Sequence, residues 1–403
     1  MVIISRIKNS MSDVKINGQT IYITAFIIYL VSAFLKTSMI TPAYFSIHLL
    51  NYCAYLAIAL LFLKLAFFTS YSFEQILFTG FVLLFFGLSW MKSSSPLAFY
   101  TGAFLVSASD IDFDEIIKTY FVVGLVMLVV VIALAELHVI KNLVYVRGDK
   151  IRESFGILYP TDFASHVFYL VLSYLYIKKG QIRTGSYIFI FLIGILIYVL
   201  TDARLDSVLI FLVIPVNLIC SKYAFKDGGS GLSIADTIWP ATGIFAYFAI
   251  FSTIFFKNES IFAILNRLIS SRISLSHLGY MKYGIPLIGQ RIKEHGWGGS
   301  SGYKNFNAGG GLHQYFMLDS SFVRLLLIYG VVVFISVIAV VAIMAYQATA
   351  MKDYVFVGIL FLISLSCLID QHMLEIAYNP FYIAAYSIFN RYIKTRKVGN
   401  TNE

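Results

Sequence analysis

The chain has 403 residues, of which 59% are hydrophobic and 13% are charged, and its formal net charge is +9. Soluble domains carry roughly 25% charged residues, so a soluble core could not hide this much apolar surface. The composition excludes an ordinary soluble domain and predicts an integral membrane protein. Basic residues are expected on the cytoplasmic loops of such proteins, so the positive charge does not indicate a nucleic-acid partner.

Apolar runs recur along the whole chain at the length that a membrane requires. A helix needs about 20 mostly apolar residues to cross the hydrocarbon core, where its backbone satisfies its own hydrogen bonds. Such runs lie at 20–36, 45–68, 75–91, 96–109, 116–136, 161–177, 185–201, 205–221, 238–256, 321–345, 354–370 and 375–390. The first twenty residues contain no cleavable apolar core, so we expect no signal peptide. The predicted fold class is an all-α integral membrane protein with about twelve transmembrane helices.

The basic residues predict how these spans are oriented. An even number of spans places both termini on one side, and lysine and arginine mark the cytoplasmic loops. The basic residues near the termini and in two short loops are Arg6, Lys8, Lys15, Lys178, Lys179, Arg183, Lys222, Lys226, Arg391, Lys394, Arg396 and Lys397. We therefore expect cytoplasmic termini and an outer loop at 137–160. The chain then divides into nine spans (1–256), a large extracytoplasmic loop (257–320), and three spans with a basic tail (321–403).

The large outer loop has two parts. Between 260 and 278 apolar residues recur at helical spacing, with Arg267 and Arg272 among them. This pattern predicts an amphipathic helix on the outer membrane interface. The stretch GWGGSSGYKNFNAGGG follows, with seven glycines in sixteen residues. So much glycine opposes a helix, and we predict an irregular, mobile loop there.

Ionisable residues gather at the outer ends of the spans, where such groups are costly and usually mark function. They are Arg147, Arg152, Asp162, His166, Arg204, Arg267, Arg272, His277, Arg291, His295, His313, Asp319, Arg324, Asp370, His372 and Glu375. Arginine suits a phosphate ligand, because guanidinium binds phosphate in a planar, two-pronged geometry. A lipid-linked diphosphate would place its tail in the bilayer and its head at this level. No GxxxxGKS or GxxxxGKT motif is present, so we expect the reaction to use the activated bond of its own substrate.

Structural roles are alternatives for several of these residues. Arg204 stands between two aspartates, which predicts a local ion pair, and Arg324 could extend toward lipid headgroups. Asp162 and His166 have the spacing of a hydrogen-bonded pair on one helix face, which is favoured over a catalytic dyad. The segment DQHMLE has the residue types of a metal site, but its spacing favours a polar turn, and no metal or other cofactor is predicted.

Four segments carry a resemblance to a known family. They are RESFGILYPTDFASHVFYLVL, TDARLDSVLIFLV, YGIPLIGQRI and LHQYFMLDSSFVRLLLIYG. With the twelve-span outline they resemble the O-antigen polymerase (Wzy) family, which is related to the O-antigen ligases and has a fold similar to GT-C glycosyltransferases. Ligases typically place His-Asn before the helix that follows the large loop. Asp319-Ser320 stands there in this chain, which favours a polymerase.

The resemblance implies an activity on the outer face of the bacterial plasma membrane. A growing glycan would move from undecaprenyl diphosphate to a sugar hydroxyl on an incoming lipid-linked repeat unit, without a metal. A polysaccharide chain-length regulator is an implied partner. This chemistry needs cations at the departing diphosphate and a base for the attacking hydroxyl. The candidate cations are Arg204 and Arg291, followed by Arg147, Arg152, Arg267, Arg272 and Arg324.

Asp319 and His313 are the two candidates for the base. A carboxylate at a membrane edge can have its pKa raised by desolvation or lowered by a nearby arginine. Histidine has an ordinary pKa near neutrality and suits proton transfer, but His313 lies in the glycine-rich segment. Asp319 could instead cap the helix that begins beside it.

Three rival functions compete with polymerisation. An O-antigen ligase would share the donor and differ in its acceptor. A flippase or other transporter of lipid-linked oligosaccharide would place charges in mid-helix and often show two similar halves, whereas the charges here lie at the outer ends and no repeat is visible. A structural scaffold would leave the outer arginines unexplained.

Overall fold

The computed structural model describes residues 17–224, 234–257, 261–309 and 315–400. It is 73% helical. His313 and the basic residues Arg6, Lys8, Lys15 and Lys226 lie outside the described residues, so the predictions that rest on them stay predictions.

The described part of the chain contains seven helices that are long and apolar enough to cross a membrane. They are α2 (Gly18–Lys36), α4 (Ile47–Phe67), α5 (Phe73–Ser93), α7 (Phe113–Glu136), α9 (Thr184–Thr201), α10 (Arg204–Ala224) and α17 (Val331–Ala350). Three shorter apolar helices are α6 (Leu97–Ser107), α12 (Ala241–Ile254) and α18 (Tyr354–Ser366). α8 (Pro160–Ile177) packs against α7 and α10. The chain is thus an all-α, multi-pass membrane protein.

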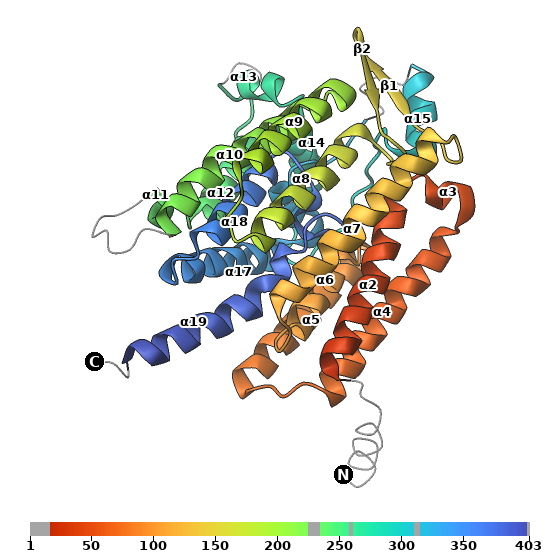
Figure 1. Cartoon of the computed structure of the whole chain (residues 1–403). Coiled ribbons are helices and arrows are strands. Elements are labelled where there is room, and N and C mark those ends of the chain that lie inside the picture. The colour runs from red at the N-terminus through yellow and green to blue at the C-terminus, as the bar shows by residue number, and fades with distance from the viewer. Residues whose placement is uncertain (1–16, 225–233, 258–260, 310–314, 401–403) are drawn as a thin grey trace.

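Figure 1 shows the long helices packed side by side, with the connecting elements concentrated at one end of the bundle. At that end lie α3 (Ile40–Tyr44), a hairpin of β1 (Val144–Arg147) and β2 (Lys150–Glu153), α13 (Ile261–Leu268), and α15 (Gly299–Asn307). The start of α2 lies at the opposite end. α14 (Arg272–Tyr283) lies within the large loop and α16 (Ser321–Arg324) follows it. α11 (Ile234–Thr237) precedes α12.

Two local predictions for the outer segments need correction. The expected single helix at 260–278 is broken into α13 and α14, because Ser270 and Ser271 have φ of 57° and 65°. The loop predicted at 137–160 contains the β1–β2 hairpin, about which no prediction was made. The glycine-rich segment contains a helix, α15, because its Tyr303 and Phe306 rings pack 5.2 and 5.3 Å from the ring of Tyr145. Tertiary packing here outweighs the low helix propensity of glycine.

The last predicted span, 375–390, is not one continuous helix. The chain between α18 and α19 (Ala385–Asn400) forms two 3₁₀ turns, η3 (His372–Leu374) and η4 (Phe381–Ala384), joined by irregular backbone. This backbone lies inside the bundle, where Thr101 of α6 donates to the carbonyl of Leu374 (2.5 Å) and Tyr120 of α7 donates to that of Tyr378. Non-helical backbone at membrane depth persists where protein groups satisfy it. We call residues 370–380 the interior segment.

The span predicted at 321–345 is also divided. α16 is followed by a π-helical turn, η2 (Leu325–Tyr329), and α17 begins after Gly330. Residues 286–290 of the large loop pass beside this break in the helix, where the amide of Val331 donates to the carbonyl of Pro286 (3.0 Å). We call residues 286–290 the crossing segment. The π turn and the crossing segment place Arg324 and Asp319 beside the large loop.

We expect Gly330→Ala to lower the free energy of unfolding by about 1–3 kcal/mol. Gly330 has φ of 91°, and an added Cβ would lie 2.4 Å from the amide nitrogen of Gly289. Because that neighbour is backbone, the crossing segment must shift. Thermal unfolding of the purified protein in detergent measures the effect. The matched control is Gly80→Ala in α5, where an added Cβ meets nothing within 4 Å. Equal melting temperatures for the two variants would contradict the prediction.

Candidate functional site

A group of cations surrounds Asp202 at the turn between α9 and α10. The Asp202 carboxylate is 1% exposed and accepts hydrogen bonds from Arg147 and from Arg204 Nε (3.1 Å), with Lys150 Nζ at 3.4 Å. Burial alone would raise its pKa, but the hydrogen bonds from Arg147 and Arg204 hold it at about 2. Arg147 and Arg204 remain 41% and 62% exposed. Three cations share one carboxylate, so the turn keeps an excess of positive charge. We call these four residues the cation turn.

Arg152 holds the hairpin against the end of α9. Its Nε donates to the carbonyl of Thr201 (2.8 Å), its Nη1 donates to the hydroxyl of Tyr159 (3.3 Å), and its side chain is buried. The guanidinium lies 5.4 Å from the centre of the Tyr159 ring. These contacts satisfy Arg152 within the protein, so it positions the cation turn rather than offering itself to a ligand.

Two further predicted residues form ion pairs beside the large loop. Arg272 Nε lies 3.2 Å from Asp319, and Arg324 lies 2.7 Å from Glu294. All four side chains are 14–19% exposed. Arg324 therefore pairs inside the protein and does not extend toward headgroups.

Asp319 does not cap the helix that follows it. The N-cap of α16 is Ser320, and Asp319 accepts its hydrogen bond from Arg272. Burial raises the pKa of Asp319, and the Arg272 charge opposes that rise. Asp319 is thus an ion-pair partner in this structure, and its predicted role as a base is not tested by it.

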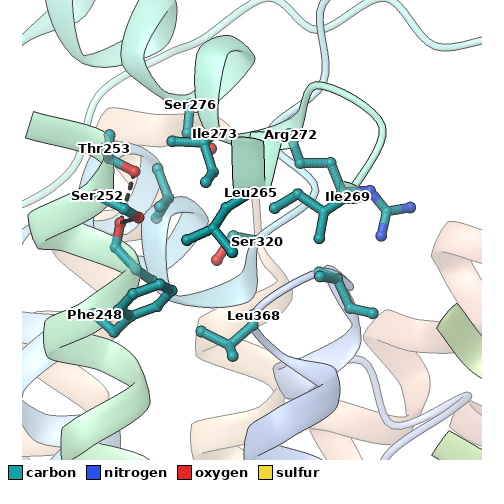
Figure 2. Close-up of a pocket in the computed structure, with 13 residues that line it drawn as sticks. Phe248, Ser252, Thr253, Leu265, Ile269, Arg272, Ile273, Ser276, Ser320 and Leu368 are labelled. Carbon is teal, nitrogen blue, oxygen red and sulfur yellow. Dashed lines mark hydrogen bonds between the residues drawn. The ribbon is translucent and has the colours of Figure 1, made fainter. Parts of the chain in front are cut away.

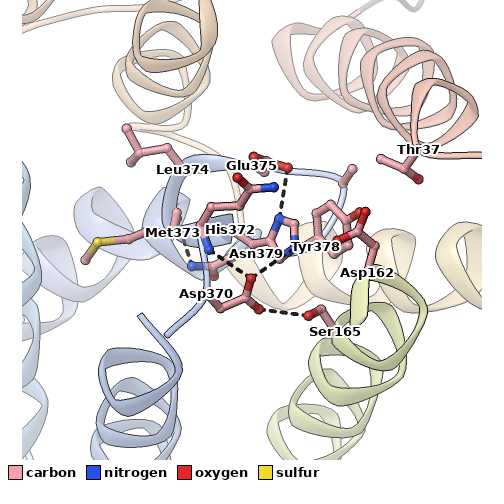
Figure 3. Close-up of polar contacts among 12 residues, drawn as sticks. Thr37, Asp162, Ser165, Asp370, His372, Met373, Leu374, Glu375, Tyr378 and Asn379 are labelled. Atoms are coloured by element: carbon pink, nitrogen blue, oxygen red, sulfur yellow. Dashed lines mark hydrogen bonds and ion pairs between the residues drawn. The ribbon is translucent and has the colours of Figure 1, made fainter. Parts of the chain in front are cut away.

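The interior segment contributes a histidine surrounded by carboxylates (Figure 3). His372 Nε2 lies 3.1 Å from Asp370 and 3.8 Å from Asp162, and its Nδ1 lies 3.0 Å from Glu375. Burial would lower the pKa of His372, but the three carboxylates raise it to about 10. The carboxylates therefore favour the protonated form of the imidazole. Asp162, Asp370, His372 and Glu375 are called the histidine cluster below.

The histidine cluster adjoins the Arg272–Asp319 pair. The Ser165 hydroxyl lies between Asp206 of α10 and Asp370 of the histidine cluster, 3.1 Å from the first carboxylate and 2.8 Å from the second. Arg272 in turn interacts electrostatically with both Asp206 and Asp370. Asp206 lies in the first turn of α10, two residues after Arg204 of the cation turn. The cation turn, the two ion pairs beside the large loop and the histidine cluster are together called the charged region.

An apolar pocket of about 100 Å³ lies on the other side of Arg272. Its lining residues include Phe248, Leu265, Ile269, Ile273 and Leu368. Figure 2 shows the alkyl part of Arg272 beside these side chains and its guanidinium directed away from them. Arg272 therefore marks a boundary between apolar and charged surroundings.

Two predicted arginines do not join this region. Arg267 is exposed on α13 and reaches only the carbonyl of Ala263 (3.5 Å), and Arg291 is exposed. His166 does not pair with Asp162, contrary to expectation. It contacts the hydroxyl of Thr37 (3.0 Å) and stacks on the Tyr378 ring at 3.9 Å. The stacking aligns α8 with the interior segment.

The central role of the interior segment does not follow from the sequence patterns above. The segment DQHMLE, with Asp370, His372 and Glu375, favours a polar turn, and those patterns give no role to Asn379 or Glu294. The available signal was the density of ionisable residues directly after an apolar run. Among the described residues no cluster of His, Cys, Asp and Glu has the arrangement of a metal site.

The fold and this region together define a multi-pass helical membrane protein with a charged region at one end of its bundle. No family profile, curated protein or solved structure matches the chain.

Proposed function

We propose that this chain is a polysaccharide polymerase of the bacterial plasma membrane. It would transfer a growing glycan from undecaprenyl diphosphate to a sugar hydroxyl of an incoming lipid-linked repeat unit. One observation carries the proposal: Arg272 separates an apolar pocket from a charged region that also holds an excess of cations at the cation turn. A ligand with a hydrocarbon tail and a diphosphate head has an apolar part and an anionic part that match these two surroundings.

The arginines and carboxylates have different tasks in this proposal. Arg204 and Arg147 are largely exposed, so they can bind diphosphate oxygens and stabilise the negative charge that develops on the leaving group. Arg272 can exchange part of its contact with Asp319 for the diphosphate. The carboxylates of the histidine cluster can accept hydrogen bonds from sugar hydroxyls. Arg291 is exposed and contacts no member of the charged region among the described residues, so it has the least structural support of the predicted catalytic residues.

The proposal includes twelve spans, cytoplasmic termini and a site on the outer face. The alternation of the helices supports it, because the large connecting elements collect at one end of the bundle while α2 begins at the other (Figure 1). A reporter fused after Arg147 and one fused after Lys178 would test the orientation. The first is expected outside and the second inside.

A transporter of lipid-linked oligosaccharide is the second candidate. Irregular backbone and a carboxylate–histidine cluster inside the bundle are features that proton-coupled transporters use. An O-antigen ligase would also fit the diphosphate contacts, since it differs only in its acceptor.

We expect Arg204→Ala to abolish polymer while leaving single repeat units in place. Surface polysaccharide from a strain deleted for this gene is separated on a gel after complementation with the wild type or the variant. The wild type should restore a ladder, and the variant should leave core plus one repeat unit. Loss of every repeat unit would instead favour a ligase or a flippase. A wild-type ladder from the variant would remove Arg204 from the site.

A further inference from the structure

One carboxylate in the charged region lacks a hydrogen-bond donor. Asp206 accepts from Ser165, Asp370 accepts from the amide of Gln371, Glu375 contacts the His372 ring, Asp319 accepts from Arg272 and Glu294 from Arg324. Within the described residues no hydrogen bond is donated to Asp162, whose nearest charged partner is His372 at 3.8 Å. The Asp162 side chain is 23% exposed, so its carboxylate can accept a hydrogen bond from a group outside the protein.

Asp162 is also placed where a substrate can reach it. It lies in the first turn of α8, at the end of the bundle where the hairpin and α15 gather. Its side chain is 23% exposed, the largest value among Asp162, Asp319, Asp370, Glu294 and Glu375. Figure 3 shows its carboxylate on the His372 and Tyr378 side of α8. A carboxylate that is open on one side and held by a cation on the other is suited to accept a proton.

We propose that Asp162 is the catalytic base and that His372 is the residue that positions it. This inference rests on the proposed function. The acceptor sugar hydroxyl would give its proton to the Asp162 carboxylate while its oxygen forms a bond to the anomeric carbon of the donor glycan. The bond from that carbon to the phosphate oxygen breaks, and its electron pair leaves with undecaprenyl diphosphate. Asp162 then releases the proton to water.

Asp319 is less suited to this step. Its carboxylate already accepts a hydrogen bond from Arg272, and a base that is engaged by a guanidinium must give up that bond before it takes a proton. Asp319 instead holds Arg272 in place at the edge of the apolar pocket. The two acids thus have separate tasks, one for the proton and one for the cation.

Several groups face Asp162 and would shape its pH dependence. They come from the interior segment, the hairpin and the large loop, and are His372, Asp370, Glu375, Tyr145, Tyr315 and Asp319. His372 is the one basic group among them. In the wild type, protonation of the base should lower the rate at low pH, which gives the pH profile an acid limb. A variant without the Asp162 carboxylate should lack this acid limb.

The test uses the full-length protein in proteoliposomes with lipid-linked repeat unit extracted from the deletion strain. Polymer formation is measured against pH and substrate concentration for the wild type, Asp162→Asn and Asp319→Asn. Loss of a general base reduces kcat by about 10²–10⁴-fold, so we expect that loss for Asp162→Asn, with KM little changed and no acid limb. Asp319→Asn should keep the acid limb and raise KM.

A second variant separates chemistry from folding. Asp162→Ala should regain activity when formate is added, because formate can occupy the vacated space and take the proton, whereas a structural defect would not respond. A wild-type rate and pH profile for Asp162→Asn, or no response to formate, would overturn the assignment. If the wild type itself makes no polymer from the verified substrate, the proposed function fails first, and that result is distinguishable from failure of the variants.

Discussion

Replacement of Arg272 by alanine is expected to abolish polymer formation, with a loss of about 10²–10³-fold in kcat. Arg272 is the cation that lies at the boundary between the apolar pocket and the charged region, so its loss removes charge stabilisation where the diphosphate would leave. Arg272→Lys should recover only part of the rate, because an ammonium group cannot bind phosphate in two-pronged geometry. The assay is polymer formation in proteoliposomes.

The matched control is Arg267→Ala. Arg267 is an exposed arginine five positions earlier in the same loop and contacts no other charged side chain among the described residues. It should polymerise at the wild-type rate. Because loss of Arg272 also leaves Asp319 unpaired, the double variant Arg272→Ala/Asp319→Ala tests whether an unfavourable buried charge explains the defect. Recovery of activity in the double variant would refute a role for Arg272 in catalysis.

The membrane-spanning architecture could be predicted because hydrocarbon imposes one strong rule on the chain. Every backbone group in lipid needs an internal partner, so helices of predictable length and composition follow from hydropathy alone. Six of the seven long helices begin and end within a few residues of predicted spans, whereas α17 begins ten residues after the start of the predicted span 321–345. Where protein surrounds the backbone, other parts of the chain can satisfy its polar groups, so a helix is no longer required. The run at 375–390 has the composition of a span, yet its first part is not helical, and Thr101 and Tyr120 from distant helices satisfy carbonyls of the interior segment.

The residues of the charged region were mostly visible in the sequence, but their partners were not. Arg272, Asp319 and Arg324 were selected from their position at the membrane edge. The pairing of Arg272 with Asp319 across 47 positions, and of Arg324 with Glu294 across 30, depends on how the loop returns to the bundle. In the same way, α15 forms because a hairpin residue, Tyr145, packs against it, and no local pattern carries that information.

His372→Leu is expected to lower the free energy of unfolding by about 3–5 kcal/mol at neutral pH. The His372 side chain is 2% exposed and is the cation that three carboxylates share, so its removal leaves buried negative charges without a partner. The double variant His372→Leu/Glu375→Gln should recover part of the loss, since it removes one of the abandoned charges. Thermal unfolding in detergent measures both variants.

The difference in stability between the wild type and His372→Leu should depend on pH. The pKa of His372 is raised from 6.5 to about 10 in the folded protein. A raised pKa means that the folded state holds the proton more tightly, so this stabilisation is fully present below pH 6.5 and is lost as the pH rises through about 10. The difference in melting temperature between the wild type and His372→Leu should therefore shrink from about pH 6 to about pH 10. A difference that stays constant across this range would show that His372 stabilises the interior segment by packing alone.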